Sequence, residues 1–152
     1  MKSDEMSVKF LLKGSPAVAG LPFRSVKDAI LGKQYKLSIV FCGNSLSQKL
    51  NRIYRGRNKP TNILAFPLSK SEGEIFLNLP LARREATLYA SRFTFHPDFA
   101  SGHALYVPRF TLHVLRLVIH GMLHLKVMRH SVRMEQAEQK FNNKFLRIVN
   151  KE

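Results

Sequence analysis

The sequence predicts one domain of mixed α and β structure, and three observations support this prediction. The chain has 152 residues, about the modal size of one domain, which can bury roughly two thirds of its unfolded surface around one core. Apolar residues make up 45% of it, which argues against a disordered or fibrous chain. Strand-like and helix-like segments alternate along it without an internal repeat. We therefore expect residues 1–152 to form a single domain.

The first part of the chain contains signals for two strands and two helices. Residues Ser7–Leu12 have the pattern of a first strand, and Pro22 opens a helix, FRSVKDAIL, that ends at a glycine. KLSIVFC at 36–42 is apolar and β-branched enough for a buried strand. A turn follows, with Ser45 as the expected N-cap of the helix SLSQKLNRIY.

The second part begins with RGRNKPT (55–61), a basic loop in which glycine and proline both oppose helix. The strand-like segments NILAFPL and EIFLNL are separated by a short turn, which predicts an antiparallel hairpin. Helical patterns follow in LARREATLYASRF, RFTLHVLRLVIHGMLHLKVM and SVRMEQAEQKFNNKFLRIV. Residues 94–108 have no periodicity, and we expect a loop there.

The charge balance indicates a polyanionic partner. Lys and Arg number 25 against 10 Asp and Glu, a formal net charge of +15, whereas a magnitude of about 2 to 8 suffices for the solubility of a small domain. Such an excess attracts phosphate backbones through counterion release. We expect nucleic acid or ribosomal partners.

Cysteine usage and hydropathy exclude several other classes. Cys42 is the single cysteine, so a disulfide framework or a thiolate zinc cluster is excluded and a reducing compartment fits. The apolar stretches are far shorter than the roughly 20 residues that span a bilayer. Lys9 and Lys13 interrupt the apolar region near the N-terminus, which argues against a signal peptide. No membrane partner is expected.

Three histidines in HGMLHLKVMRH (120–130) form a candidate metal site. His120 and His124 are four residues apart, so on a helix their rings can point to one place. His130 would be rotated by about 600° from His124 on a continuous helix, well off that face. The chain must therefore turn back after Lys126 if His130 is to be a third ligand.

Two interpretations of these histidines remain open from spacing alone. Three neutral imidazoles could hold a zinc ion with a fourth position for water, and zinc would lower the pKa of that water toward about 7. Alternatively, this is a basic helix that happens to contain imidazoles. Gly121, Met122 and Leu123 leave no glutamate between the first two histidines, so a metalloprotease of the HExxH type is not expected.

Two separate motifs resemble one known family. HGMLHLKVMRH resembles the HGxLHLxGYDH signature of the YbeY family of ribosomal RNA maturation factors, which are metal-dependent, single-strand-specific endoribonucleases. LNRIYRGRNKPTNILAFPL (50–68) resembles the family's LNxxYRGxDxPTNVLSFPF block, and GEIFLN resembles the GDIxI strand that follows it. The segments occur in the family's order, so the resemblance runs from about residue 36 to the C-terminus.

The resemblance implies an α+β fold, a small mixed β-sheet packed with about five α-helices, of a zinc-dependent hydrolase kind. It implies one zinc ion per chain, held by His120, His124 and His130. The arginine of the family's NxxYRG block falls on Arg55, whose guanidinium could hold an RNA phosphate bidentately and stabilise charge developing on its oxygens. Arg55 and His120 are therefore the expected catalytic residues.

The resemblance also implies a function. We expect zinc-activated water to attack the scissile phosphorus, while Arg52, Arg55, Arg57 and Lys59 bind and guide single-stranded RNA. The expected role is maturation of small-subunit, 16S-type ribosomal RNA and ribosome quality control. The partners would be ribosomal RNA or the small ribosomal subunit, in the cytoplasm or in a mitochondrion or other organelle. The sequence does not predict the oligomeric state.

The sequence departs from the family signature at one place. Val127, Met128 and Arg129 stand where the signature has Gly-Tyr-Asp; valine resists the left-handed conformation in which a glycine could end the helix. The arginine replaces a carboxylate beside the third expected ligand. Two alternatives therefore stay open. One is a non-catalytic RNA- or ribosome-binding protein of the same fold, and the other is a metal-dependent hydrolase of a different phosphoester.

Overall fold

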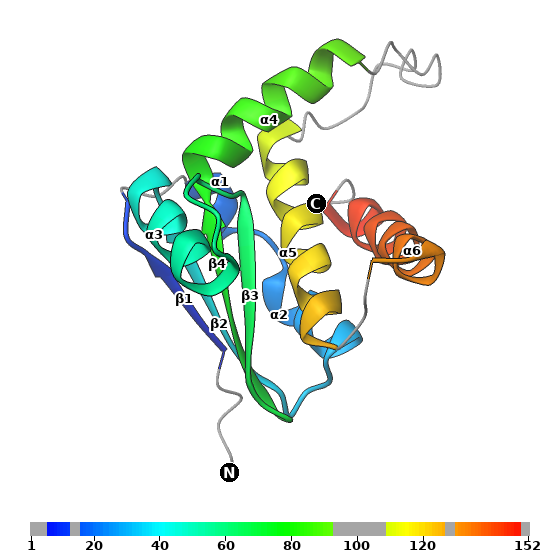
Figure 1. Cartoon of the computed structure of the whole chain (residues 1–152). Helices are drawn as coiled ribbons and strands as arrows, with labels where there is room; N and C mark the ends of the chain where they lie inside the picture. Colours follow the sequence, from blue (N-terminus) through cyan, green and yellow to red (C-terminus); the bar gives the residue numbers. More distant parts are fainter. Residues whose placement is uncertain (1–5, 13–15, 93–108, 127–129, 150–152) are drawn as a thin grey trace.

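The computed structural model shows a sheet with helices on both of its faces (Figure 1). It describes residues 6–12, 16–92, 109–126 and 130–149. The expected loop at 94–108 and the Val127–Arg129 departure lie outside these residues.

A four-stranded mixed sheet is the centre of the fold. Its strands lie in the order β1-β2-β4-β3, with bounds β1 Met6–Phe10, β2 Lys36–Cys42, β3 Ile63–Ser69 and β4 Glu72–Asn78. β1, β2 and β4 run parallel, and β3 pairs with β4 in the antiparallel sense. The expected hairpin and the expected mixed sheet are both confirmed.

The described part of the chain contains five helices of eight residues or more and the single turn α1. Their bounds are α1 Pro16–Ala19, α2 Phe23–Ile30, α3 Asn44–Arg55, α4 Leu79–Arg92, α5 Arg109–Leu125 and α6 Val132–Val149. This agrees with the α+β fold implied by the resemblance. None of the described helices combines the length and hydropathy that crossing a bilayer requires.

Helix α5 packs directly against the sheet. A Cβ added at Gly121 would lie 2.9 Å from Cδ1 of Ile63 and 3.1 Å from Cδ1 of Ile75, so a larger residue here would require these side chains to shift. The contact fixes the position of α5 relative to the start of β3. Helix α3 covers part of the opposite face, where Val40 and Leu64 are buried.

The prediction of Ser45 as an N-cap is wrong. Helix α3 begins at Asn44, and Gly43 is its N-cap, with extended backbone and without a side-chain cap. The first helical hydrogen bond runs from the Ser47 N–H to the Gly43 carbonyl. A contact from far along the chain accompanies this start, because the Asn78 amide donates to Oδ1 of Asn44 at 2.9 Å.

Asn78 also accounts for a second shift in the expected boundaries. Its Oδ1 accepts a hydrogen bond from the Leu81 N–H at 3.1 Å, which is the geometry of an N-cap and N3 pair. Strand β4 therefore ends at Asn78 and α4 begins at Leu79, two residues before the expected start. The first strand is Met6–Phe10 rather than Ser7–Leu12.

Candidate metal centre and basic pocket

The structure brings the three predicted histidines together. One ligand atom from each of His120, His124 and His130 lies within 4.8 Å of the others. The Nε2 atoms of His120 and His124 are 3.1 Å apart, and the His130 ring centroid is 5.2 Å from that of His120 and 4.6 Å from that of His124. The chain thus turns back between α5 and α6, as the spacing required.

The donor set fits a divalent metal ion. Imidazole nitrogens are common zinc ligands, and a site with three protein ligands keeps a coordination position for water or substrate. His120 and His124 are partly buried, whereas His130 is exposed, so the cluster is open to solvent on one side. These three residues could hold a metal ion.

Glu138 of α6 orients one of the three rings. Its Oε1 lies 3.0 Å from Nδ1 of His120. Because an ionised carboxylate only accepts hydrogen bonds, Nδ1 donates, and in the neutral ring Nε2 keeps the lone pair that a metal needs. Glu138 is not among the site residues predicted from the sequence. The contact joins two helices, and no local spacing in the sequence indicates it.

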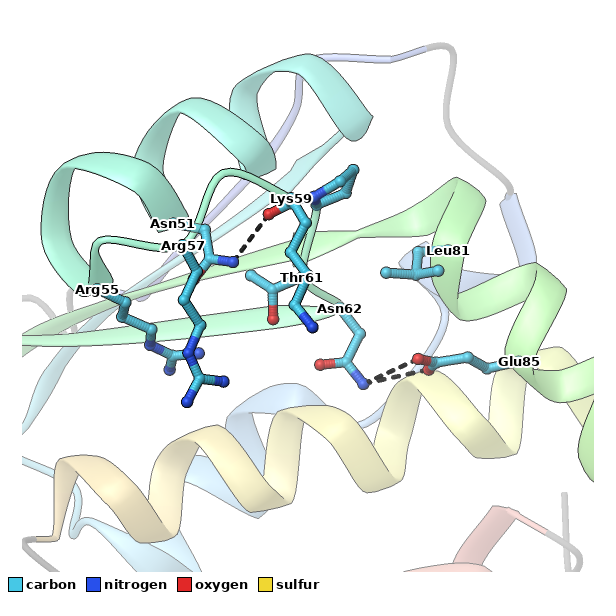
Figure 2. A pocket seen from close by; sticks show the side chains of 9 residues that line it. Asn51, Arg55, Arg57, Lys59, Thr61, Asn62, Leu81 and Glu85 are labelled. Carbon is cyan, nitrogen blue, oxygen red and sulfur yellow. Dashed lines mark hydrogen bonds between the residues drawn. The ribbon is translucent and has the colours of Figure 1, made fainter.

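A basic pocket lies at the end of α3 (Figure 2). Its volume is about 230 Å³, below the roughly 300–1,000 Å³ of pockets that enclose a whole drug-sized ligand. The lining includes three of the predicted RNA-binding residues and six others: Asn51, Arg55, Arg57, Lys59, Pro60, Thr61, Asn62, Leu81 and Glu85. The fourth predicted residue, Arg52, lies in the last turn of α3 and is exposed, outside this lining.

A left-handed glycine directs the chain into the pocket. Gly56 has φ 66° and ends α3, with its N–H bonded to the carbonyl oxygen of Arg52 at 3.1 Å. Most side chains are strained at this φ, which is why glycine is common directly after a helix. The turn lets Arg55 at the end of the helix and Arg57 in the loop line the same pocket.

Two buried polar residues of α3 fix the loop that follows. Ser47 Oγ donates to the Thr61 carbonyl at 2.6 Å and accepts from the Thr61 N–H at 2.8 Å. The Asn51 amide donates to the Lys59 carbonyl at 2.8 Å. Both residues are 2% exposed, so these bonds satisfy the Ser47 hydroxyl and the Asn51 NH2 group, which would otherwise be costly to bury. The loop is held by its backbone, and its cationic side chains remain available.

The pocket concentrates positive charge. Partial burial lowers the pKa of the Arg55 guanidinium, and the charge of Arg57 lowers this pKa further. The Arg55 guanidinium nevertheless remains protonated at neutral pH. Within the described residues, no carboxylate forms an ion pair with Arg55 or Arg57. An anion that entered the pocket would relieve the repulsion between them.

The opposite wall of the pocket contains a polar network. Glu85 of α4 accepts from the Asn62 amide and lies 2.8 Å from Nε2 of His113 in α5. His113 is seven residues before His120, so the two point to nearly the same side of α5, about 10 Å apart along its axis. His113 lies outside the three-histidine cluster.

The pocket and the histidine cluster are neighbours. The Ile63 side chain lies against α5 at Gly121, because a Cβ added there would be 2.9 Å from its Cδ1, and each of these residues adjoins a site residue. Asn62 of the pocket precedes Ile63, and His120 of the cluster precedes Gly121. The fold therefore places three cations beside three convergent imidazoles.

These features define a small α+β protein with a three-histidine centre next to a basic pocket. A family model described as Endoribonuclease YbeY matches residues 23–151. The chain belongs to the YbeY family.

Individual relatives agree with this assignment. The chain is 36% identical over 110 residues to an Endoribonuclease YbeY of Ehrlichia chaffeensis, a match that covers 68% of this chain and 60% of the relative. It is 26% identical over 115 residues to an Endoribonuclease YbeY of Persephonella marina, a match that covers 70% of this chain and 64% of the relative. The matched region thus spans less than two thirds of the length of these curated relatives.

A solved structure shows the same fold. The solution structure of TM1509 from Thermotoga maritima superposes with a TM-score of 0.59 at 22% identity, covering 92% of this chain and 88% of that one. At this identity the likeness concerns the fold alone.

Proposed function

We propose that this protein is a metal-dependent endoribonuclease that cleaves single-stranded RNA. One observation carries the proposal: His120, His124 and His130 converge beside a pocket lined by Arg55, Arg57 and Lys59. The three histidines suit a metal ion that promotes hydrolysis, and the cationic residues of the pocket suit the phosphate backbone of a nucleic acid. The name of the relatives, Endoribonuclease YbeY, supports this combination.

Zinc is the metal that we propose, with one ion per chain. His120, His124 and His130 would hold it, and Glu138 would orient the His120 ring. Bound there, the ion would act as a Lewis acid and increase the acidity of water at the site.

The chain's own residues would bind and orient the RNA. Arg55 is the residue that we expect to hold the scissile phosphate, because its planar fork can bond two phosphate oxygens and stabilise charge that develops on them. Arg57 and Lys59 would bind the same or the adjoining phosphate. Arg52, outside the pocket, would attract the strand over a longer range. Binding should therefore weaken with salt, in proportion to the number of phosphates neutralised.

The substrate that we propose is ribosomal RNA of the small subunit, whose maturation and quality control require cuts in exposed single strands. The net charge of +15 favours a large polyanion over a neutral small molecule. Such a substrate implies a location where ribosomes are assembled, the cytoplasm or an organelle.

A second candidate function is RNA or ribosome binding without cleavage. The observation that favours it is the sequence Val127-Met128-Arg129 in place of the Gly-Tyr-Asp of the family signature. The additional positive charge beside His130 would oppose cation binding unless the side chain pointed away from the cluster.

A cleavage assay distinguishes the two functions. The metal-stripped protein and the zinc-supplemented protein are each incubated with a single-stranded RNA, the same RNA as a duplex, and the DNA of the same sequence. We expect internal cuts in the single-stranded RNA, only with zinc. If the protein binds the RNA but does not cleave it with any added divalent metal ion, the second candidate is supported and the first is contradicted.

A further inference from the structure

The side-chain amide of Asn62 has a fixed orientation. Its Nδ2 lies 3.2 Å from each of the two carboxylate oxygens of Glu85. A carboxylate accepts hydrogen bonds and has none to donate. The NH2 group must therefore face Glu85, and the carbonyl oxygen Oδ1 must point away from it.

Glu85 is itself held in place. Nε2 of His113 lies 2.8 Å from its Oε2, and the His113 side chain is only 12% exposed. Asn62 immediately precedes β3, Glu85 lies in α4 and His113 lies in α5. Three elements thus fix the direction of one amide, and so the acceptor is rigid before a ligand arrives.

The Asn62 oxygen faces the cationic side of the pocket. Figure 2 shows it directed away from Glu85, toward the side where Arg55 and Arg57 extend. Among the described residues, no donor is hydrogen-bonded to it. The pocket therefore combines several charged donors with one neutral acceptor. Its ligand should carry an anion and, close to that anion, a neutral hydrogen-bond donor.

We propose that Asn62 accepts a hydrogen bond from a ribose 2′-hydroxyl and so selects RNA over DNA, with Glu85 and His113 as positioning residues. In RNA the 2′-hydroxyl is on the carbon next to the one that carries the 3′-phosphate, so a pocket that binds the phosphate also reaches the hydroxyl. Amino groups of the bases lie further away, and about 230 Å³ suits part of a nucleotide. A 2′-hydroxyl both donates and accepts, and it is the group by which proteins distinguish RNA from DNA.

The inference rests on the proposed RNA substrate, and binding tests it separately from cleavage. A short unstructured oligoribonucleotide with a fluorescent label is titrated with protein in a chelator that prevents metal-dependent cleavage. The matched 2′-deoxy oligonucleotide, with uracil in both, is titrated in the same way. The parent should bind the ribo form about three- to tenfold more tightly, the effect of one hydrogen bond.

The Asn62→Ala variant should lose most of this preference and bind the deoxy form as the parent does. Asn58→Ala is the matched control, since Asn58 lies in the same loop, pairs with Gln48 and is exposed; it should keep the preference. A persistent preference in Asn62→Ala would overturn the inference. Equal binding, or no binding, of the two oligonucleotides by the parent would also overturn it.

A second variant covers the case in which Asn62→Ala does not fold. In Glu85→Gln the new side chain could accept from Nδ2 of Asn62 or donate to Oδ1, so the amide direction is no longer fixed. The ribo preference should fall at least twofold, and an unchanged preference would overturn the role of Glu85. If the parent shows the Asn62-dependent preference but cuts no RNA, the inference stands and the proposed nuclease activity fails.

Discussion

Glu138 and His120, on different helices, are joined by a hydrogen bond of 3.0 Å between Oε1 and Nδ1. This bond selects the ring tautomer in which Nε2 carries no proton, and that nitrogen lies 3.1 Å from Nε2 of His124. Partners of this kind usually contribute about 10- to 100-fold to metal affinity.

Glu138→Ala should weaken zinc binding about 10- to 100-fold, measured by competition with a chromophoric chelator. Glu138→Gln should weaken it less, because the amide oxygen can still accept from Nδ1. Glu135→Gln removes a carboxylate from the same helix at an exposed position and should leave affinity unchanged. Equal affinities for the Glu138→Ala protein and its parent would contradict an orienting role.

Arg55→Ala should lower kcat for RNA cleavage about 10²- to 10³-fold, with KM changed only slightly, because the guanidinium acts mainly on charge that develops in the transition state. Arg55→Lys should recover part of the loss, since an ammonium keeps the charge but not the bidentate geometry. Lys70→Ala removes an exposed cation from the β3–β4 turn and serves as the control. A loss that appeared entirely in KM would refute the proposed role.

Cys42 provides a prediction about pH. Burial raises the pKa of its thiol to about 11, and the residue is 1% exposed. In the unfolded chain the thiol loses its proton near pH 9, so between about pH 9 and 11 the unfolded state binds fewer protons than the folded state. The free energy of unfolding should therefore fall as the pH rises through this window.

The measurement is urea unfolding of the parent and of Cys42→Ala at pH 8 and at pH 10.5. The variant lacks the titrating group. The free energy of unfolding of the parent, relative to that of the variant, should therefore fall by about 1–2 kcal/mol between pH 8 and pH 10.5. Folded protein should also resist alkylation at pH 8. A pH-independent difference between the two proteins would contradict the assigned burial of the thiol.

Local spacing was sufficient to predict the parts of the site that lie close together in the sequence. The four-residue interval predicted that His120 and His124 would converge, and helix geometry required the helix to end before His130, as α5 does at Leu125. RGRNKPT was identified as a basic loop from glycine, proline and charge alone. These features depend on a few consecutive residues, and tertiary contacts did not alter them.

The remaining features depend on contacts between distant segments. Ser45 was a plausible N-cap by residue type, yet the helix begins at Asn44, whose side chain bonds Asn78 from β4. Glu138 and Glu85 act on residues 18 and 28 positions away, respectively. Such pairs have no periodic signal, because the packing of α4, α5 and α6 creates them.

The most direct test of the proposed metal-dependent activity is the metal content of the purified protein, measured by elemental analysis beside a His124→Ala variant prepared in the same way. His113→Ala, seven residues before His120 and outside the cluster, is the matched control. We predict about one zinc per chain in the parent and in His113→Ala, and none in His124→Ala. A folded parent that contains no metal and takes up none from added zinc would contradict the account.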